Sequence, residues 1–462
     1  MTEKSKDSFL NWLVIGAGLV CCAVYLFLAQ ESFRPNGASL IGVGTAFLSV
    51  SLLTLCLFAL FRYRATPISA HCVLLFALLF RLIGAFGDPI LEDDHYRYLW
   101  DGWMTLNQGT PYNSPPSDWF ASAQVPEQLE FVLDGINYPD VPTVYGPTAQ
   151  LFFAASALLM PGSLIPLKVF IVVADCLVLL LLARLATTPW LLLYGWSFLL
   201  VKEFAFTAHV DALGASLLFI TFCLRQRMGV ASNTVLSVAV GALLAAALGV
   251  KVICLVAVPF LLQTDWRSWL AFTLTMLLLG LPFGFVSAWL PGGLIAMSAG
   301  GVFNAPVYLL AMNAFPGIDL VLVKTLCVTL LAIICLLVGQ RYLLLPYLAR
   351  GNLTDAALFR APAILPRDYL NGLNTLWCAQ LLLSPVLNPW YLVWWLPFAC
   401  LKPSRVAWVA SFLLALSYIS GINLNDTSLQ AYEQPFWVLL LEFVPIFLEF
   451  LWDLKRPLAQ VR

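Results

Sequence analysis

Long apolar runs separated by short polar turns make up most of this chain, and they predict a bundle of membrane helices. A helix crosses a bilayer with about 20 mostly apolar residues, and hydrocarbon offers no water to its backbone. Runs of this kind lie at 10–29, 39–61, 68–87, 164–185, 189–204, 211–224, 233–250, 252–264, 268–285, 319–340, 369–386, 389–402, 405–420 and 434–452. They predict an all-α integral membrane protein, a polytopic helical bundle with about 12 to 14 spans.

The composition supports a membrane protein and excludes an ordinary soluble domain. Hydrophobic residues make up 61% of the 462 residues and charged residues 11%, and the mean hydropathy is +0.88. Membrane lipid is therefore an expected partner. The net charge is −1 and the basic residues form no stripe, which argues against nucleic acid as a partner. Most of the 11 Cys lie inside apolar runs, so we expect small apolar residues and not disulfides or metal ligands.

One long polar segment, residues 88–143, follows the third apolar run. It carries ten acids and a single base, Arg97. Such a segment cannot lie in hydrocarbon, so it is predicted to form a large loop in water at one face of the membrane. The turns rich in Lys and Arg place the opposite face in the cytoplasm. We therefore expect cytoplasmic termini, an outer loop at the periplasmic or extracellular face of the inner (plasma) membrane, and a re-entrant or surface-lying segment at 145–160.

The pattern divides the chain into four parts. Residues 1–67 hold the N-terminal spans, and residues 68–340 form a transmembrane module that includes the outer loop 88–143. Residues 341–368 form a cytoplasmic link that contains several Arg, and residues 369–462 hold the C-terminal spans. The chemistry is expected in the second part, because polar residues between its spans fall near the outer face.

The stretch EDDHYRYLWDG at 92–102 contains the candidate catalytic acids. Asp93 and Asp94 follow a Gly-Asp-Pro helix stop and precede a helix-compatible stretch, so they lie near a helix N-terminus, which stabilises carboxylates. A carboxylate held in this way can accept a proton from a hydroxyl or bind a divalent cation, Mg²⁺ or Mn²⁺, for which Asp94 is the candidate ligand. The alternative is a capping acid, but three acids in a row exceed what capping needs.

Four further polar residues lie beside apolar runs. His209 and Asp211 separate two such runs, and a His beside a carboxylate can bind phosphate or orient a hydroxyl; the alternative role of Asp211 is helix capping. Lys251 and Arg81 are single cations in apolar surroundings, where a charge is costly and marks a candidate functional site. The structural alternative for such a cation is to extend to the membrane interface.

The segment SPVLNPWYLVWWLP at 384–397 is interrupted by prolines and rich in aromatic residues. An aromatic belt at the membrane interface has the same composition and is the simpler explanation. Trp390 and Tyr391 could instead stack on a sugar ring. The chain has no Walker A, HExxH or GxSxG motif, so nucleotide-driven transport and zinc proteolysis have no support.

These motifs carry a family resemblance. They are EDDHYRYLWDGW at 92–103, GTPY at 109–112, INYPDVPTVYGPTAQLFF at 136–153, HVDALG at 209–214 and NPWYLVWWLP at 388–397. In this order they resemble the bacterial GT-C superfamily of glycosyltransferases. Within it, the chain is similar to the mannosyltransferase-like group near glycosyltransferase family 87, whose donors are polyprenyl-phosphate sugars. The chain departs from that pattern in TVYGPTAQ, where relatives usually have Tyr-Pro-Pro, and in His95, where an aliphatic residue is common.

The resemblance implies a GT-C bundle that transfers a hexosyl group, with mannose as the expected sugar. The transfer runs from a polyprenyl-phosphate donor to a glycan, lipid or protein acceptor at the outer face, with inversion. The family's acidic motif maps to Asp93 and Asp94, and Asp93 is the expected base. The donor phosphate is expected to meet Lys251 first, then Arg97 or Arg81, with His209 nearby. The further expected substrate contacts are Glu92, His95, Asp101, Tyr145, Glu203, Asp211, Trp390 and Tyr391.

Two alternatives to this function stay open at the level of sequence. A flippase for lipid-linked sugars, or another secondary transporter, also uses broken helices and buried cations. Such a protein would place its charges near the middle of the membrane, whereas the densest polar cluster here lies in the outer loop. A polymerase or ligase of lipid-linked glycans is the alternative among enzymes.

Overall fold

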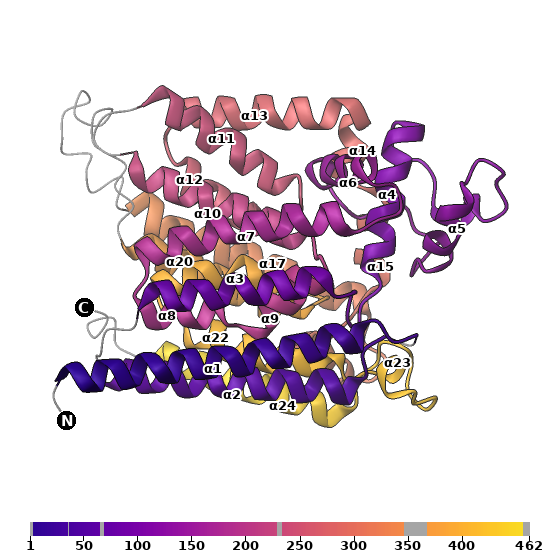
Figure 1. Ribbon diagram of the computed structural model, residues 1–462. Coiled ribbons are helices and arrows are strands. Elements are labelled where there is room, and N and C mark those ends of the chain that lie inside the picture. The colour runs from indigo at the N-terminus through magenta and orange to yellow at the C-terminus, as the bar shows by residue number, and fades with distance from the viewer. Residues whose placement is uncertain (1–2, 36, 65–68, 229–232, 346–366, 456–462) are drawn as a thin grey trace.

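The computed structural model describes residues 3–35, 37–64, 69–228, 233–345 and 367–455, and it is all-helical over these ranges. The long helices run roughly side by side in one bundle, and α4, α5, α6 and α14 gather at one of its ends (Figure 1). Two short segments, around Phe303 and Val386, pair through a single β-bridge. The predicted all-helical fold is therefore confirmed for the described residues.

The helix boundaries follow the apolar runs. The α-helices are α1 (Glu3–Ser32), α2 (Leu40–Arg64), α3 (Ala70–Phe86), α4 (Asp94–Gln108), α5 (Glu127–Asp134), α6 (Pro147–Leu159), α7 (Ile165–Leu185), α8 (Thr188–Gly195), α9 (Phe198–Val201), α10 (Asp211–Arg227), α11 (Thr234–Leu248), α12 (Val258–Leu262), α13 (Trp266–Gly280), α14 (Phe285–Trp289), α15 (Gly292–Gly300), α16 (Pro306–Ala314), α17 (Leu320–Gly339), α20 (Arg367–Leu383), α21 (Leu396–Leu401), α22 (Arg405–Leu413), α23 (Gly421–Leu424) and α24 (Phe436–Lys455). The short 3-10 helices are η1 (Pro116–Trp119), η3 (Val252–Ala257), η4 (Leu281–Phe283), η6 (Pro389–Trp394) and η7 (Leu414–Tyr418), and the π-helices are η2 (Lys202–Phe206) and η5 (Gln340–Leu344).

Side-chain caps explain where several of these helices begin. Ser69, Asn233, Asp265, Asp319 and Ser404 each precede a helix and accept a hydrogen bond from a backbone N–H of its first turn. These N–H groups have no partner within the helix, so a short polar side chain at the cap position satisfies them.

Five helical segments of the described chain are long and apolar enough to cross a membrane. They are Leu10–Ser32, Leu40–Arg62, Ile165–Leu185, Trp266–Phe283 and Leu320–Leu344, and a sixth is the pair Phe198–Phe206 and Asp211–Arg227 if this pair, bent by 115°, counts as one span. These segments support a helical membrane protein. The expected number of about 12 to 14 spans is not reached by this measure. Breaks explain the difference: the run at 252–264, for example, folds into η3 and the five-residue α12.

The segment at 145–160 contains α6, whose 13 residues are fewer than a crossing needs. The N–H groups of Thr148 and Ala149 donate to the carbonyl of Gly249 at 2.9 and 3.3 Å. A Cβ on Gly146 would collide with the same carbonyl, and one on Gly249 would collide with Thr148. These two glycines therefore let the start of α6 approach the end of α11, which brings Tyr145 and Lys251 into one region.

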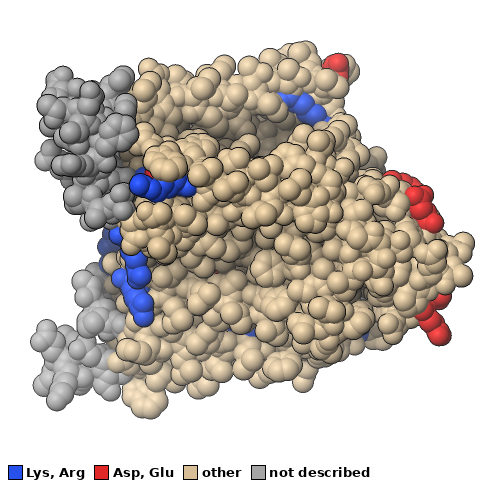
Figure 2. Space-filling view, turned by 90° about the horizontal axis from the view of Figure 1, so that it is seen from above, with Lys and Arg blue, Asp and Glu red and all other residues tan. Residues whose placement is uncertain are grey.

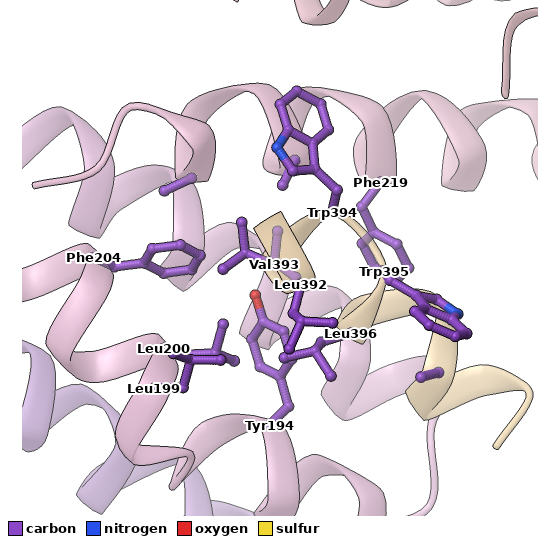
Figure 3. Packing of buried hydrophobic residues seen from close by; sticks show 14 of the residues in the cluster. Tyr194, Leu199, Leu200, Phe204, Phe219, Leu392, Val393, Trp394, Trp395 and Leu396 are labelled. Atoms are coloured by element: carbon purple, nitrogen blue, oxygen red, sulfur yellow. The ribbon is translucent and has the colours of Figure 1, made fainter. Parts of the chain in front are cut away.

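The aromatic segment after Pro389 lies inside the bundle. Trp394 and Trp395 of the η6–α21 region are 0% and 2% exposed, and they belong to the same buried cluster as Leu199, Leu200 and Phe204 of α9 and η2, part of which Figure 3 shows. An aromatic belt would face lipid headgroups instead. The belt explanation therefore does not hold for Trp394 and Trp395, which are core residues.

The two ends of the bundle differ in charge. Helix α1 begins and α24 ends at the end opposite to α4 and α5 (Figure 1). On the face shown in Figure 2, most of the visible Lys and Arg side chains lie toward the end where α1 begins, and acidic side chains lie at the end of α4 and α5. This polarity is what the orientation predicted from Lys and Arg requires. Which compartment each end faces stays a prediction, and residues 346–366 of the expected link lie outside the described residues.

We expect residues 88–143 to be accessible from outside the cell. In a variant without the 11 native Cys, a cysteine introduced by Ala123→Cys, at an exposed position, should react with a membrane-impermeant maleimide in intact cells. Gln226→Cys, exposed at the end of α10, is the matched control and should react only after permeabilisation. The reverse pattern would invert the topology.

Candidate functional site

A cavity of about 1690 Å³ opens at the end of the bundle where α4 begins. Its polar part contains the acids Glu92, Asp93 and Asp94 together with Lys251. Many apolar side chains of α14, α15, α16 and α24, and Phe303 between α15 and α16, also line it; we call this set the apolar arm, and its members are Trp289, Leu294, Met297, Phe303, Leu309, Met312, Phe436 and Leu439. The cavity therefore offers both charged groups and apolar surface to one ligand.

Asp93 stands directly before α4, but its carboxylate does not cap this helix. One carboxylate oxygen accepts a hydrogen bond from Asn137 Nδ2 at 2.6 Å, and the hydroxyl of Tyr432 lies 3.5 Å from the other. Burial and the neighbouring Asp94 raise the pKa of Asp93 to about 6. Capping alone therefore does not explain this acid, which faces the cavity in a form that can take up a proton near neutral pH.

Asp94 is the first residue of α4 and also lines the cavity. It accepts a hydrogen bond from the hydroxyl of Tyr145 at 3.2 Å, and His209 Nδ1 lies 3.9 Å from the same oxygen. Burial raises the pKa of Asp94, and the charge of Lys251 opposes this effect. Tyr145, predicted as a substrate contact, therefore orients this carboxylate and lines the cavity beside it.

A buried polar cluster lies next to Asp94, on the side away from the cavity. Glu203 and His209 are both fully buried, with 3.3 Å between His209 Nε2 and a carboxylate oxygen of Glu203. Glu203 also accepts a hydrogen bond from Tyr418 at 2.6 Å and contacts Lys202 at 3.2 Å. The imidazole of His209 stacks on Trp390 with 3.9 Å between ring centroids. His209 and Glu203 thus support Asp94 and Trp390 from behind and are not among the residues that line the cavity.

Lys251 lies between α11 and η3 with its side chain 22% exposed. Its ammonium group donates to both carboxylate oxygens of Asp211 at 3.1 and 3.2 Å, and it lies 4.1 Å from the centroid of the Tyr391 ring. Asp211 is buried and accepts a further hydrogen bond from Trp394 at 2.8 Å. The four residues fix an ammonium group at the cavity surface, so Asp211 acts through Lys251.

Arg97 lines the cavity, but its guanidinium is occupied by the outer loop. It donates to the carbonyl oxygens of Val141, Tyr138 and Asn137 at 3.0, 3.0 and 3.2 Å. Since Asn137 in turn contacts Asp93, Arg97 positions the loop that holds the candidate base. The structure thus gives the predicted phosphate ligand a positioning role.

Arg81 is not brought to the site. It is fully buried, forms an ion pair with Asp175 and donates to the carbonyl of Gly195 at 2.7 Å. Neither Arg81 nor Asp175 lines the cavity. The prediction that Arg81 contacts a donor phosphate is not supported, because this cation already has a carboxylate partner that joins α3 to α7.

Two further predicted substrate contacts lie away from the cavity. Asp101 is buried in α4, where it accepts hydrogen bonds from Thr143 and, at 3.0 Å, from Gln150. His95 packs against Tyr96, and burial lowers its pKa to about 4, so the ring is neutral at physiological pH. Neither side chain lines the cavity. Asp101 instead joins α4 to the loop before α6.

Within the described residues, no group of three or more His, Cys, Asp or Glu side chains is placed to hold a metal ion. Asp94 has Tyr145 as a partner and His209 nearby, but it lacks a second carboxylate arranged as a metal ligand. The residues therefore do not fit the Mg²⁺ or Mn²⁺ site that the acidic motif allowed.

The structure adds residues that the sequence did not single out. Asn137 and Tyr138 come from INYPD in the outer loop, and Tyr432 comes from the segment between α23 and α24; all three line the cavity. The first two lie inside a recognised motif, which was a usable signal. Tyr432 had no such signal, because the last part of the chain contains no motif.

A scan against protein-family models, a search of curated proteins and a search of solved structures each find no match to this chain. The assignment of the site therefore depends on its own residues and geometry.

We expect Arg97→Met to loosen the outer loop. Losing three hydrogen bonds from a charged donor should speed amide hydrogen exchange at residues 137–141 by at least about tenfold, with little change in α10. Arg405→Met is the control, because Arg405 is an exposed residue paired with Glu449. Unchanged exchange at 137–141 would show that Arg97 does not hold this loop.

Proposed function

We propose that this protein is a membrane glycosyltransferase of the GT-C type. It transfers a hexosyl group, with mannose as the first candidate, from a polyprenyl-phosphate donor to an acceptor hydroxyl at the outer face of the membrane, with inversion. The observation that carries the proposal is that one cavity joins an apolar arm, the cation Lys251 and the carboxylate of Asp93. A polyprenyl-phosphate sugar has the matching parts: an apolar chain, a phosphate and a sugar.

In the proposed reaction, Asp93 takes the proton of the acceptor hydroxyl as its oxygen attacks the anomeric carbon of the donor sugar. The bond between that carbon and the phosphate oxygen breaks, and the lipid phosphate leaves with the electron pair. With its pKa at about 6, Asp93 is deprotonated at neutral pH and acts as a base by position. Lys251 stabilises the charge that develops on the leaving phosphate.

The proposal assigns the donor phosphate to Lys251 alone. Among the described residues that line the cavity, the basic side chains are Arg97 and Lys251, and Arg97 is occupied by three carbonyls. Lysine carries three N–H donors and acts as a point charge. Asp211 and Trp394 hold Lys251 in place while its exposed side reaches the cavity.

A flippase or other secondary transporter is the alternative. The 115° break between η2 and α10, beside buried charges, is a feature that transporters also use. A transporter moves a lipid-linked sugar without cleaving it, whereas a transferase, polymerase or ligase forms a new glycosidic bond, so the reaction products distinguish the two classes.

We expect purified protein to transfer the sugar from polyprenyl-phosphomannose and not from GDP-mannose. Each donor is supplied separately with an acceptor, and lipid products are separated from free sugar. Efficient transfer from GDP-mannose without carrier lipid would contradict the proposal. Movement of intact donor across proteoliposomes with no new glycoside would favour the transporter.

Asp93→Asn should lower kcat by about 10² to 10⁴, with the donor KM nearly unchanged, because it keeps the shape and removes the proton acceptor. Asp118→Asn, at an exposed acid of the same loop, is the matched control.

Lys251→Gln should raise the donor KM and also slow transfer, and Lys251→Arg should recover part of the loss. For the Asp93 variant, full turnover in Asp93→Asn would show that another group is the base.

The transfer rate should also depend on pH. Because Asp93 must be deprotonated, kcat/KM should fall as the pH drops through about 6. Asn137→Ala removes a donor that stabilises the carboxylate, so it should move this acidic limb upward by roughly one pH unit. Asn113→Ala, exposed and outside the cavity lining, should leave the limb in place. If the acidic limb does not move in Asn137→Ala, the limb does not report the titration of Asp93.

A further inference from the structure

Two tyrosines from separate loops meet at the cavity next to Asp93. Tyr138 comes from the outer loop before α6, and Tyr432 comes from the segment between α23 and α24. Both line the cavity, and their side chains are 47% and 37% exposed. Their rings stack with 5.9 Å between centroids and an interplanar angle of 25°. The pair thus presents aromatic surface to solvent and to the cavity.

The position of Tyr138 is fixed by its surroundings. Its backbone has a φ of +48°, which is rare for a bulky residue. Its carbonyl accepts a hydrogen bond from Arg97, and so do the carbonyls of Asn137 and Val141. A residue persists in such a conformation only where its neighbours enforce it, and these residues cluster at ligand-binding sites. Arg97 therefore fixes the backbone from which the Tyr138 side chain reaches the cavity.

The pair is also tied to the candidate base. The hydroxyl of Tyr432 lies 3.5 Å from one carboxylate oxygen of Asp93, and Asn137, the neighbour of Tyr138, donates to the other at 2.6 Å. A ligand that stacks on these rings would therefore place its nearest hydroxyl at the carboxylate that takes up the proton.

The polar groups around the pair suit a neutral ligand with many hydroxyls. Asn423, Gln430 and Glu433, which are close to Tyr432 in the sequence, also line the cavity. Amides and carboxylates bind hydroxyls, and aromatic rings pack against the apolar C–H face of a sugar. The acids Asp93 and Glu433 beside the pair disfavour an anionic acceptor, and the guanidinium of Arg97 is already occupied by three carbonyl oxygens.

We propose that Tyr138 and Tyr432 form the acceptor subsite, and that the acceptor is a neutral glycan whose terminal sugar stacks on this pair. The acceptor role rests on the proposed function, whereas binding of the sugar does not. The apolar arm formed by α14 to α16 and α24 lies in the same cavity and takes the lipid chain of the donor. Lys251 and the tyrosine pair thus contact different substrates.

The test begins with binding in the absence of donor. The purified full chain in detergent is applied to an array of neutral oligosaccharides, and the affinity for the best ligand is measured by calorimetry. Tyr138→Ala and Tyr432→Ala should each weaken binding by about tenfold, because each removes a stacking ring. Tyr432→Phe keeps the ring and should retain most of the affinity. Phe120→Ala, at an exposed aromatic of the outer loop that does not line the cavity, is the control and should bind like the wild type.

Transfer assays separate this inference from the proposed function. With polyprenyl-phosphomannose as donor, both Ala variants should raise the KM for the glycan acceptor by about tenfold and leave the donor KM unchanged. If no neutral oligosaccharide binds, or if the Ala variants bind as tightly as the wild type, the subsite is overturned. Unimpaired transfer by these variants to a peptide or a lipid alcohol would also overturn it, while the proposed function stands. Binding that depends on the tyrosines without any transfer would reject the proposed function and the acceptor role, and would keep the tyrosine pair as a sugar-binding site.

Discussion

A charge buried among apolar helices is stable only when it has a partner, and this constraint organises the bundle. Arg81 of α3 pairs with Asp175 of α7, and Glu203 of η2 takes hydrogen bonds from Lys202 and from Tyr418 of η7. Removing one member of such a pair would leave the other charge unsatisfied, so each pair requires that its helices stay together. The Arg81–Asp175 pair and the Tyr418–Glu203 hydrogen bond link segments that lie far apart in the sequence.

Lys251 obeys the same constraint with a different outcome. Its partner Asp211 is buried, but the lysine side chain is 22% exposed at the cavity. The pair neutralises most of the charge in the apolar surroundings and leaves a donor available to a ligand. On the proposed function, an incoming phosphate then meets an ammonium group that is already held by Asp211 and by the ring of Tyr391. Positioning of this kind lowers the cost of organising the site during the reaction.

The sequence predicted the helices, because hydropathy and helix signals are local. It could not distinguish Arg81 from Lys251, since both are single cations in apolar runs. Their roles differ because Arg81 is buried in an ion pair with Asp175, whereas Lys251 lies at the break between α11 and η3. Asp94, Arg97 and Asp101 stand at helical spacing in α4, but that spacing does not tell what each contacts. Fewer helices are long enough to cross a membrane than there are apolar runs, because a hydropathy pattern does not show where a run breaks into short helices.

The role of Arg97 shows how a tertiary contact can convert a predicted ligand into a scaffold. Its three hydrogen bonds fix the loop that carries Asn137 and Tyr138. The first of these contacts Asp93, and the second stacks on Tyr432 from the end of the chain, where the sequence offered no motif. One buried guanidinium thus positions both a hydrogen-bond donor to the candidate base and the aromatic surface beside it. On the proposed function, Lys251 meets the donor phosphate and the tyrosines meet the acceptor in the cavity that Asp93 also lines, and inversion requires the donor's anomeric carbon to lie between the acceptor hydroxyl and the phosphate.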